Sequence, residues 1–209
     1  MIPIFITGTG TGIGKTIISA IVTEALQADY WKPVQAGYGG GTDSLLAQQL
    51  ISNKKSIIHP EAYRLKMPAS PHLAAAAEKK EITLNEIMAH LPQTKNQLII
   101  EGAGGLMVPL NEKEFVLDLI KKLKARVIIV SKNELGSINH SLLTAAVLKI
   151  EKVNVAGWIF SGEYKNYEKE IEKWSGFPRI ASVKQLSEIS KEIIKIQAKR
   201  MRPFLQNIL

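Results

Sequence analysis

The stretch Phe5–Thr16, FITGTGTGIGKT, decides the fold class of this chain. It begins as an apolar run, passes through alternating glycines and ends in the Gly-Lys-Thr that is typical of a phosphate-binding loop. The usual pattern, G-x-x-x-x-G-K-[ST], places a glycine five residues before Gly14, but Thr9 occupies that position. Because the nearest upstream glycine is Gly8, the loop is one residue longer than the usual one.

The composition of this loop favours an anion site. Its glycines let successive backbone N–H groups point at one phosphate, and the helix expected from Lys15 adds the positive end of its dipole. Lys15 supplies a full charge toward the β- and γ-phosphates, and Thr16 an oxygen for Mg²⁺. A glycine turn without a ligand is the alternative, but Gly-Lys-Thr after a buried strand favours phosphate. The predicted nucleotide contacts are Thr11, Gly12, Ile13, Gly14, Lys15, Thr16 and Ile17.

A dinucleotide site of the Rossmann type fits the same stretch less well. The motif G-x-G-x-x-G would require glycine at Ile13 or, in a second register, at Lys15. The acidic residue expected about 20 residues farther on is replaced by Lys32, whose charge has the wrong sign for a ribose hydroxyl. A dinucleotide cofactor is therefore not expected.

Short β-branched runs alternate with helical patterns along the chain. The runs 98–100 and 127–130 are apolar throughout, as in strands buried on both faces of a parallel sheet. We predict one α/β domain over residues 1–209, with a mainly parallel sheet flanked by helices and ligands at the carboxyl ends of the strands. The predicted strands are 2–7, 30–34, 97–101, 126–131 and 153–160, and the predicted helices are 15–26, 115–123 and 138–150.

Polar residues follow two further predicted strands, where ligands are expected. One strand ends near Lys32-Pro33, before a glycine-rich turn and Asp43, and another ends in Glu101. Mg²⁺ takes oxygen ligands and needs only one or two carboxylates beside phosphates, so Thr16, Asp43 and Glu101 are the predicted metal ligands. The small residues after this strand let a metal–phosphate group approach the backbone; they are Gly102, Ala103 and Gly104.

Lys32 faces the same predicted crevice as Lys15. Pro33 forces an extended exit from the strand, so a lysine at this point also has a plain structural explanation. Two cations and a magnesium ion exceed the needs of a resting nucleotide, however. The surplus charge indicates a second anionic partner or charge that develops in a transition state.

Composition excludes several other kinds of protein. The chain has no cysteine, so disulfides and thiolate metal sites are excluded. No apolar stretch reaches the ~18 residues of a membrane span, and the N-terminus lacks a signal-peptide pattern, so we expect a cytoplasmic protein without membrane contact. The net charge of +8 is concentrated late, where 184–202 is predicted to form an amphipathic helix with a solvated basic face. No nucleic-acid partner is expected.

In their order along the chain, these motifs resemble the dethiobiotin synthetases of biotin biosynthesis. The resemblance extends to about Trp158, and the family's phosphate loop has the same extra residue. The matching motifs are 8-GTGTGIGKT-16, 32-KPVQAG-37, 42-TDS-44, 69-ASPHLAA-75, 101-EGAGGLMVP-109 and 135-LGSINH-140.

The resemblance implies a P-loop NTPase fold and an ATP- and Mg²⁺-dependent ligase that acts as a homodimer. Such an enzyme joins CO₂ to 7,8-diaminononanoate and closes the ureido ring of dethiobiotin. Lys15 and Lys32 would then hold the carbamate and the transferring phosphoryl group, with Thr16 beside them at the metal. Lys32, Ala36 and Asn139 would contact the substrate, Asn139 at its carboxylate.

Two departures from the family concern nucleotide recognition. Ser161 stands where members of the family often read adenine with an asparagine, and 181–184 replaces a Gly-x-x-Pro turn. The phosphate and metal groups are kept, so we predict weak selectivity for the base. Two other departures lie nearer the chemistry, where Ala36 replaces a serine and Gly10 an aspartate.

Three other functions remain as alternatives at this point. A partitioning or site-selection ATPase, a partner-binding switch, would carry a signature lysine in place of Gly10. An amidoligase related to cobyrinate synthesis would carry a glutaminase domain with a cysteine. A basic nucleic-acid-binding NTPase would show salt-sensitive retention on DNA.

Overall fold

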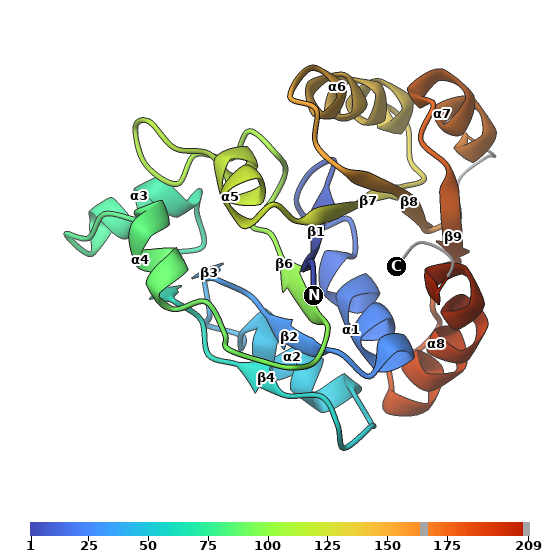
Figure 1. The fold of residues 1–209 in the computed structure, drawn as a ribbon, viewed down its shortest axis with the longest axis horizontal. Helices are drawn as coiled ribbons and strands as arrows, with labels where there is room; N and C mark the ends of the chain where they lie inside the picture. The colour runs from blue at the N-terminus through green and yellow to red at the C-terminus, as the bar shows by residue number, and fades with distance from the viewer. Residues whose placement is uncertain (164–166, 207–209) are drawn as a thin grey trace.

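The computed structural model describes residues 1–163 and 167–206, and its centre is a parallel sheet (Figure 1). The seven-stranded sheet has the order β4-β2-β6-β1-β7-β8-β9, and every neighbouring pair is parallel. A second, two-stranded parallel sheet pairs β3 with β5. The strands are β1 Ile4–Gly8, β2 Asp29–Trp31, β3 Val34–Ala36, β4 Ile58–His59, β5 Tyr63–Leu65, β6 Leu98–Glu101, β7 Arg126–Lys132, β8 Val155–Ser161 and β9 Arg179–Val183.

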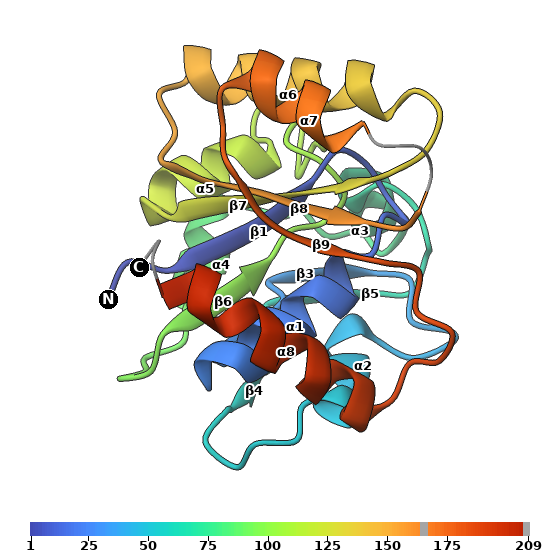
Figure 2. The same ribbon diagram turned by 90° about the vertical axis from the view of Figure 1, so that its right-hand side faces the viewer.

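Helices cover both faces of the large sheet, as Figure 2 shows. One face carries α1 Lys15–Leu26, α2 Asp43–Leu50 and α8 Lys191–Gln206, and the other carries α5 Val116–Leu123, α6 Ser137–Ile150 and α7 Glu168–Ser175. Two short helices, α3 Pro71–Ala77 and α4 Leu84–Ala89, share a hydrophobic cluster with α5. Among the described residues, no helix combines the length and hydrophobicity that a bilayer crossing requires.

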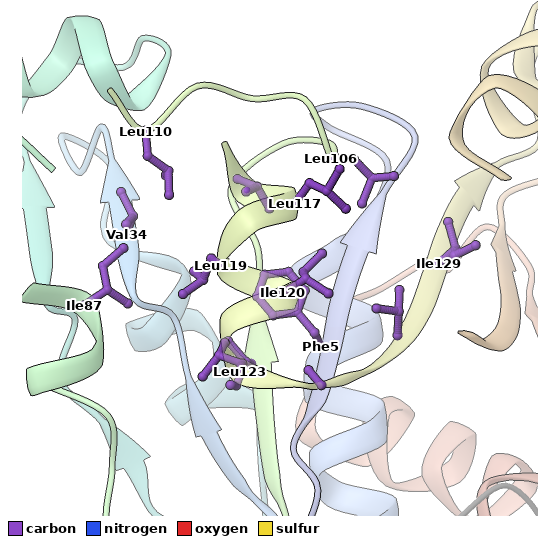
Figure 3. Packing of buried hydrophobic residues seen from close by; sticks show 14 of the residues in the cluster. Phe5, Val34, Ile87, Leu106, Leu110, Leu117, Leu119, Ile120, Leu123 and Ile129 are labelled. Atoms are coloured by element: carbon purple, nitrogen blue, oxygen red, sulfur yellow. The ribbon is translucent and has the colours of Figure 1, made fainter. Parts of the chain in front are cut away.

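The alternation of side chains along each strand divides the core into two clusters. Phe5 and Ile100 point toward α5, whereas Ile6 and Ile99 point toward α1. Figure 3 shows Phe5 of β1 beside Leu119, Ile120 and Leu123 of α5. Both faces of β1, β6 and β7 are therefore buried, which accounts for the apolar runs 4–6, 98–100 and 127–130 within them.

The structure confirms the parallel α/β fold and changes some element boundaries. Helix α1 has the predicted bounds, but the strand predicted over 30–34 is split at Lys32-Pro33. Pro33 has no N–H to donate, and the chain beyond it turns away to pair Val34 with Tyr63. The basic helix begins only at Lys191, so the prediction for 184–190 was wrong: these residues form an irregular connection from β9.

Candidate active site

The glycine-rich loop joins β1 to α1 at the carboxyl edge of the sheet. Gly14 precedes the helix with a φ of 92°, a left-handed conformation that glycine adopts without strain. A neighbouring loop also approaches closely, since a Cβ on Gly105 would lie 3.1 Å from the Gly8 carbonyl oxygen. The extra residue identified in the sequence is thus accommodated in the turn upstream of Gly14, and the helix start is unchanged.

Lys15 is buried at the first position of α1. Its Nζ donates to the carbonyl oxygen of Gly10 at 2.6 Å, so the ammonium folds back over its own loop. Burial lowers the pKa of Lys15 to about 8; the charge of Glu101 opposes this shift and that of Lys32 adds to it. A phosphate oxygen is a stronger acceptor for this ammonium than a neutral carbonyl.

Glu101, the last residue of β6, lies at the centre of the site and is only 1% exposed. Its Oε1 accepts hydrogen bonds from Thr16 Oγ1 at 2.9 Å and from Lys32 Nζ at 3.0 Å. Its Oε2 accepts a hydrogen bond from the Tyr30 hydroxyl at 2.9 Å. Tyr30 was not among the predicted site residues, because an aromatic residue in a strand predicts only core packing.

Lys32 connects Glu101 to Asp43. Its Nζ lies 3.0 Å from Glu101 Oε1 and 2.5 Å from Asp43 Oδ2. Burial by itself would lower the pKa of Lys32, but the two carboxylates together raise it above its ordinary value. Lys32 is therefore a permanent cation, held at the carboxyl end of β2 by two strongly attractive partners.

Asp43 is placed by the start of α2. Thr42 caps this helix by accepting from the Leu45 N–H, and the Gln35 side chain accepts from the Asp43 N–H at 3.1 Å. These contacts fix the backbone of Asp43 beside β3. The Asp43 carboxylate consequently faces the Lys32 ammonium at the end of β2.

A crevice of about 680 Å³ joins most of the predicted site residues. Its walls also contain an apolar group that sequence reasoning missed, formed by Val34, Leu46, Pro68, Pro71 and Val108. The predicted residues that line it are Thr11, Gly12, Gly14, Lys15, Thr16, Ile17, Lys32, Ala36, Asp43, Glu101, Ala103 and Gly104.

Three predicted residues lie outside this lining. Gly102 is turned into the protein, where a Cβ would meet the ring of Phe5 at 2.7 Å. Ile13 lines an adjoining cavity of about 250 Å³ that also includes Ser161 and Lys184. Asn139 lies in the first turn of α6 on an exposed surface, away from the crevice of its own chain.

The adjoining cavity shares Gly12, Gly14 and Ile17 with the crevice, so the two hollows meet at the glycine-rich loop. Ser161 Oγ donates to the carbonyl oxygen of Ile13 at 2.7 Å. The hydroxyl proton is therefore committed to the phosphate loop and not available to a base.

The donors at the crevice fit Mg²⁺ by their chemistry. Thr16, Asp43 and Glu101 offer the hard oxygen ligands that Mg²⁺ prefers. In the described parts of the chain, no group of three or more His, Cys, Asp or Glu side chains could hold a metal alone.

A phosphate loop between β1 and α1, with Glu101 on the neighbouring strand, defines a P-loop nucleotide-binding protein. Residues 3–193 match a family model described as an AAA domain. Among solved structures, a putative plasmid partition protein from Borrelia burgdorferi bound to AMPPNP aligns with a TM-score of 0.60 at 11% identity, covering 100% of both chains. The septum site-determining protein MinD from Pyrococcus horikoshii gives 0.58 at 13%, covering 100% of this chain and 99% of its own. These likenesses establish the fold alone.

Sequence similarity is much higher to one group of enzymes. The chain is 50% identical over 200 residues to the ATP-dependent dethiobiotin synthetase BioD of Cytophaga hutchinsonii, covering 94% of this chain and 95% of the relative. It is 44% identical over 205 residues to that of Christiangramia forsetii, covering 98% of each. The chain therefore belongs to the ATP-dependent dethiobiotin synthetase family.

Proposed function

We propose that this crevice makes dethiobiotin from 7,8-diaminononanoate, CO₂ and ATP, releasing ADP and phosphate. Family membership supports the overall reaction. One observation supports the placement of the chemistry: residues from the ends of β1, β2 and β6 and from the start of α2 face one crevice, and they are Lys15, Thr16, Lys32, Asp43 and Glu101. The permanent cation Lys32 supplies the second positive charge that a carbamate requires.

The proposed reaction needs no nucleophilic side chain. One substrate amine attacks CO₂ and loses a proton to give a carbamate, whose oxygen attacks the γ-phosphorus of ATP and displaces ADP. The second amine then attacks the carbon of the resulting carbamic–phosphoric anhydride, and phosphate leaves as the ring closes. Catalysis consists of positioning and charge stabilisation.

Each charged residue has a separate part in this proposal. Lys15 exchanges the Gly10 carbonyl for oxygens of the transferring phosphoryl group. Lys32 holds the carbamate, because its ammonium is fixed by Glu101 and Asp43. Thr16, Asp43 and Glu101 would hold Mg²⁺, which would supply positive charge to offset that of the phosphates.

The walls of the crevice suit the rest of the substrate. The apolar group that includes Val34, Pro68 and Val108 contacts the hydrocarbon chain of diaminononanoate. Ala36 contributes its backbone, since its methyl group cannot replace the hydroxyl of the serine that a family variant carries there. The carboxylate of the substrate still needs a binding partner, because no cation of the crevice is assigned to it.

We further propose that a homodimer supplies Asn139 to the partner's crevice. Asn139 shares an exposed face of α6 with Leu143, Ala146 and Ile150, which recur at helical spacing. Leu143 is 59% and Ile150 76% exposed, so burial against a second copy removes apolar surface from water. Asn139 would then bind the carboxylate of substrate held by its partner.

Three wider predictions belong to the same proposal. Residues 1–209 act as one domain. The enzyme works in the cytoplasm. It discriminates weakly between nucleotide bases. The last prediction is supported by Ser161, whose hydroxyl donates to Ile13.

Substrate-dependent phosphate release tests the proposed reaction. Wild-type protein should release phosphate from ATP only when both diaminononanoate and bicarbonate are present, and should form dethiobiotin in equal amount. Lys32→Ala should lower turnover by about 100-fold or more, the effect of removing one transition-state partner. Lys121→Ala, which removes an exposed lysine paired with Glu151, is the control. Phosphate release without either substrate, or an unimpaired Lys32→Ala, contradicts the proposal.

A further inference from the structure

Tyr30 is a fully buried tyrosine that the reaction does not use directly. It lies in the middle of β2 with an exposed fraction of 0%. A buried phenol is costly unless its hydroxyl has a partner. The structure provides one partner for this donor, Glu101 Oε2 at 2.9 Å.

The pairing of β2 with β6 produces this contact. Tyr30 lies opposite Ile99 in the parallel ladder, and Glu101 is two residues beyond Ile99. Side chains two residues apart in a strand share a face, so Tyr30, Lys32 and Glu101 all point toward the α1 side of the sheet. The long phenol reaches forward along this face to the carboxylate.

The two oxygens of Glu101 consequently have different partners. Oε1 faces the crevice, where it accepts from Thr16 and Lys32, and Oε2 faces the interior, where it accepts from Tyr30. The terminal torsion of glutamate has a broad, two-fold profile and does not select this orientation by itself. Thr16 and Lys32 hold one oxygen, and the Tyr30 hydroxyl fixes the other, so that the plane of the carboxylate is set from both sides.

Tyr30 is also a dependable donor at this position. A phenol keeps its proton at neutral pH, and the ring of Tyr30 is held by the cluster that includes Ile4 and Ile99.

We propose that Tyr30 is a positioning residue, which orients the Glu101 carboxylate so that Oε1 faces Thr16 and the metal–nucleotide group. The inference rests on the proposed function, in which Glu101 helps to hold Mg²⁺. Partners that orient a metal ligand typically affect metal affinity by about 10-fold or more. Tyr30 itself touches neither metal nor substrate.

Direct metal binding tests this role without turnover. Mn²⁺, as a paramagnetic substitute for Mg²⁺, is titrated into the enzyme saturated with AMPPNP and followed by electron paramagnetic resonance. Tyr30→Phe keeps the ring and should weaken Mn²⁺ binding by about 10-fold, with metal-free AMPPNP affinity unchanged. If Tyr30→Phe unfolds at the assay temperature, the same titration is made with Tyr30→Met, which also lacks the hydroxyl donor.

Tyr63→Phe is the matched control. The Tyr63 hydroxyl donates to the Glu81 carbonyl and accepts from the Thr83 N–H, both away from the crevice. This variant should leave Mn²⁺ affinity unchanged. Thermal unfolding of both variants separates a loss of stability from a loss of metal affinity.

A double-mutant cycle with Glu101→Gln separates the two proposals. If Tyr30 acts through Glu101, Tyr30→Phe should have little further effect on Mn²⁺ affinity in the Glu101→Gln background. If Glu101→Gln weakens binding but Tyr30→Phe does not, the positioning role is wrong and the metal role of Glu101 stands. If Glu101→Gln has no effect, the proposed metal ligand itself is wrong.

Discussion

Lys32 Nζ lies 3.0 Å from Glu101 Oε1, although 69 positions separate the two residues in the sequence. The parallel pairing of β2 with β6 brings them together, since it aligns Trp31 with Ile100 and leaves the next residue of each strand at the crevice. A cation and an anion so deeply buried depend on each other, because either one alone is an uncompensated charge in a poorly hydrated region.

This dependence predicts strong coupling in stability. Lys32→Met and Glu101→Gln should each lower the free energy of unfolding, with Lys32→Met costing about 3–5 kcal/mol because it leaves the buried Glu101 carboxylate without its cation. The double variant should be more stable than the sum of the two losses implies. Urea unfolding of the four proteins measures the coupling, and simple additivity contradicts a mutually dependent pair.

The lowered pKa of Lys15 predicts a change of stability with pH. Its pKa is about 8 in the folded protein, mainly through burial, against 10.5 for an ordinary lysine. Between these values the unfolded chain binds more protons, so Lys15 makes the protein more stable as the pH rises. Relative to Lys15→Met, wild type should gain on the order of 3 kcal/mol across this window.

Urea unfolding of wild type and Lys15→Met at pH 7, 8.5 and 10 measures the difference between their free energies of unfolding. The contributions of the other titrating groups cancel in this difference. Lys121→Met is the control, since exposed Lys121 has a pKa that its partner Glu151 raises. The Lys121→Met difference should not show the rise between pH 8 and 10. A Lys15→Met difference that stays flat over the same range shows that burial does not depress the folded-state pKa.

The orientation of Ser161 predicts weak discrimination between nucleotide bases. Its hydroxyl donates to the Ile13 carbonyl at 2.7 Å, so it does not donate to a base. Turnover per KM with ATP, CTP and GTP should agree within about 10-fold, because the Ser161 donor stays on Ile13 and so does not discriminate between bases. A steep preference for ATP contradicts this prediction.

A mixing experiment tests whether Asn139 acts across a dimer. Asn139→Ala and Lys32→Ala should each lower activity, and a mixture allowed to exchange subunits should recover part of it. In the mixed dimer, one crevice keeps its own Lys32 and receives Asn139 from the partner. If Asn139 serves its own crevice, every site in the mixture lacks one residue and no activity returns.

Leu143→Glu provides the matching test of assembly. It places a charge on the exposed apolar face of α6 and should shift the protein from dimer to monomer in analytical ultracentrifugation, as buried unpaired charges are costly. Lys149→Glu is the control on the same helix, since Lys149 lies off the stripe that joins Asn139 to Ile150. An unchanged mass for Leu143→Glu excludes this face as the interface.

The sequence by itself determined the features that depend on neighbouring residues. The bounds of α1 and the phosphate loop were predictable because glycine spacing, Lys15 and Thr16 act within one strand–turn–helix unit. Lys32, Asp43 and Glu101 were predictable as candidates because each follows a strand-like run or a glycine-rich turn, at the edge where parallel sheets bind ligands.

Only the tertiary structure decided how these residues combine. The register of β2 against β6 places Tyr30 on Glu101 and Lys32 between two carboxylates, and register depends on contacts far apart in the sequence. The same holds for the Ser161 hydroxyl on the phosphate loop and for Asn139 outside its own crevice. Local patterns determine which chemical groups are present at a strand end, whereas long-range packing determines which of them meet.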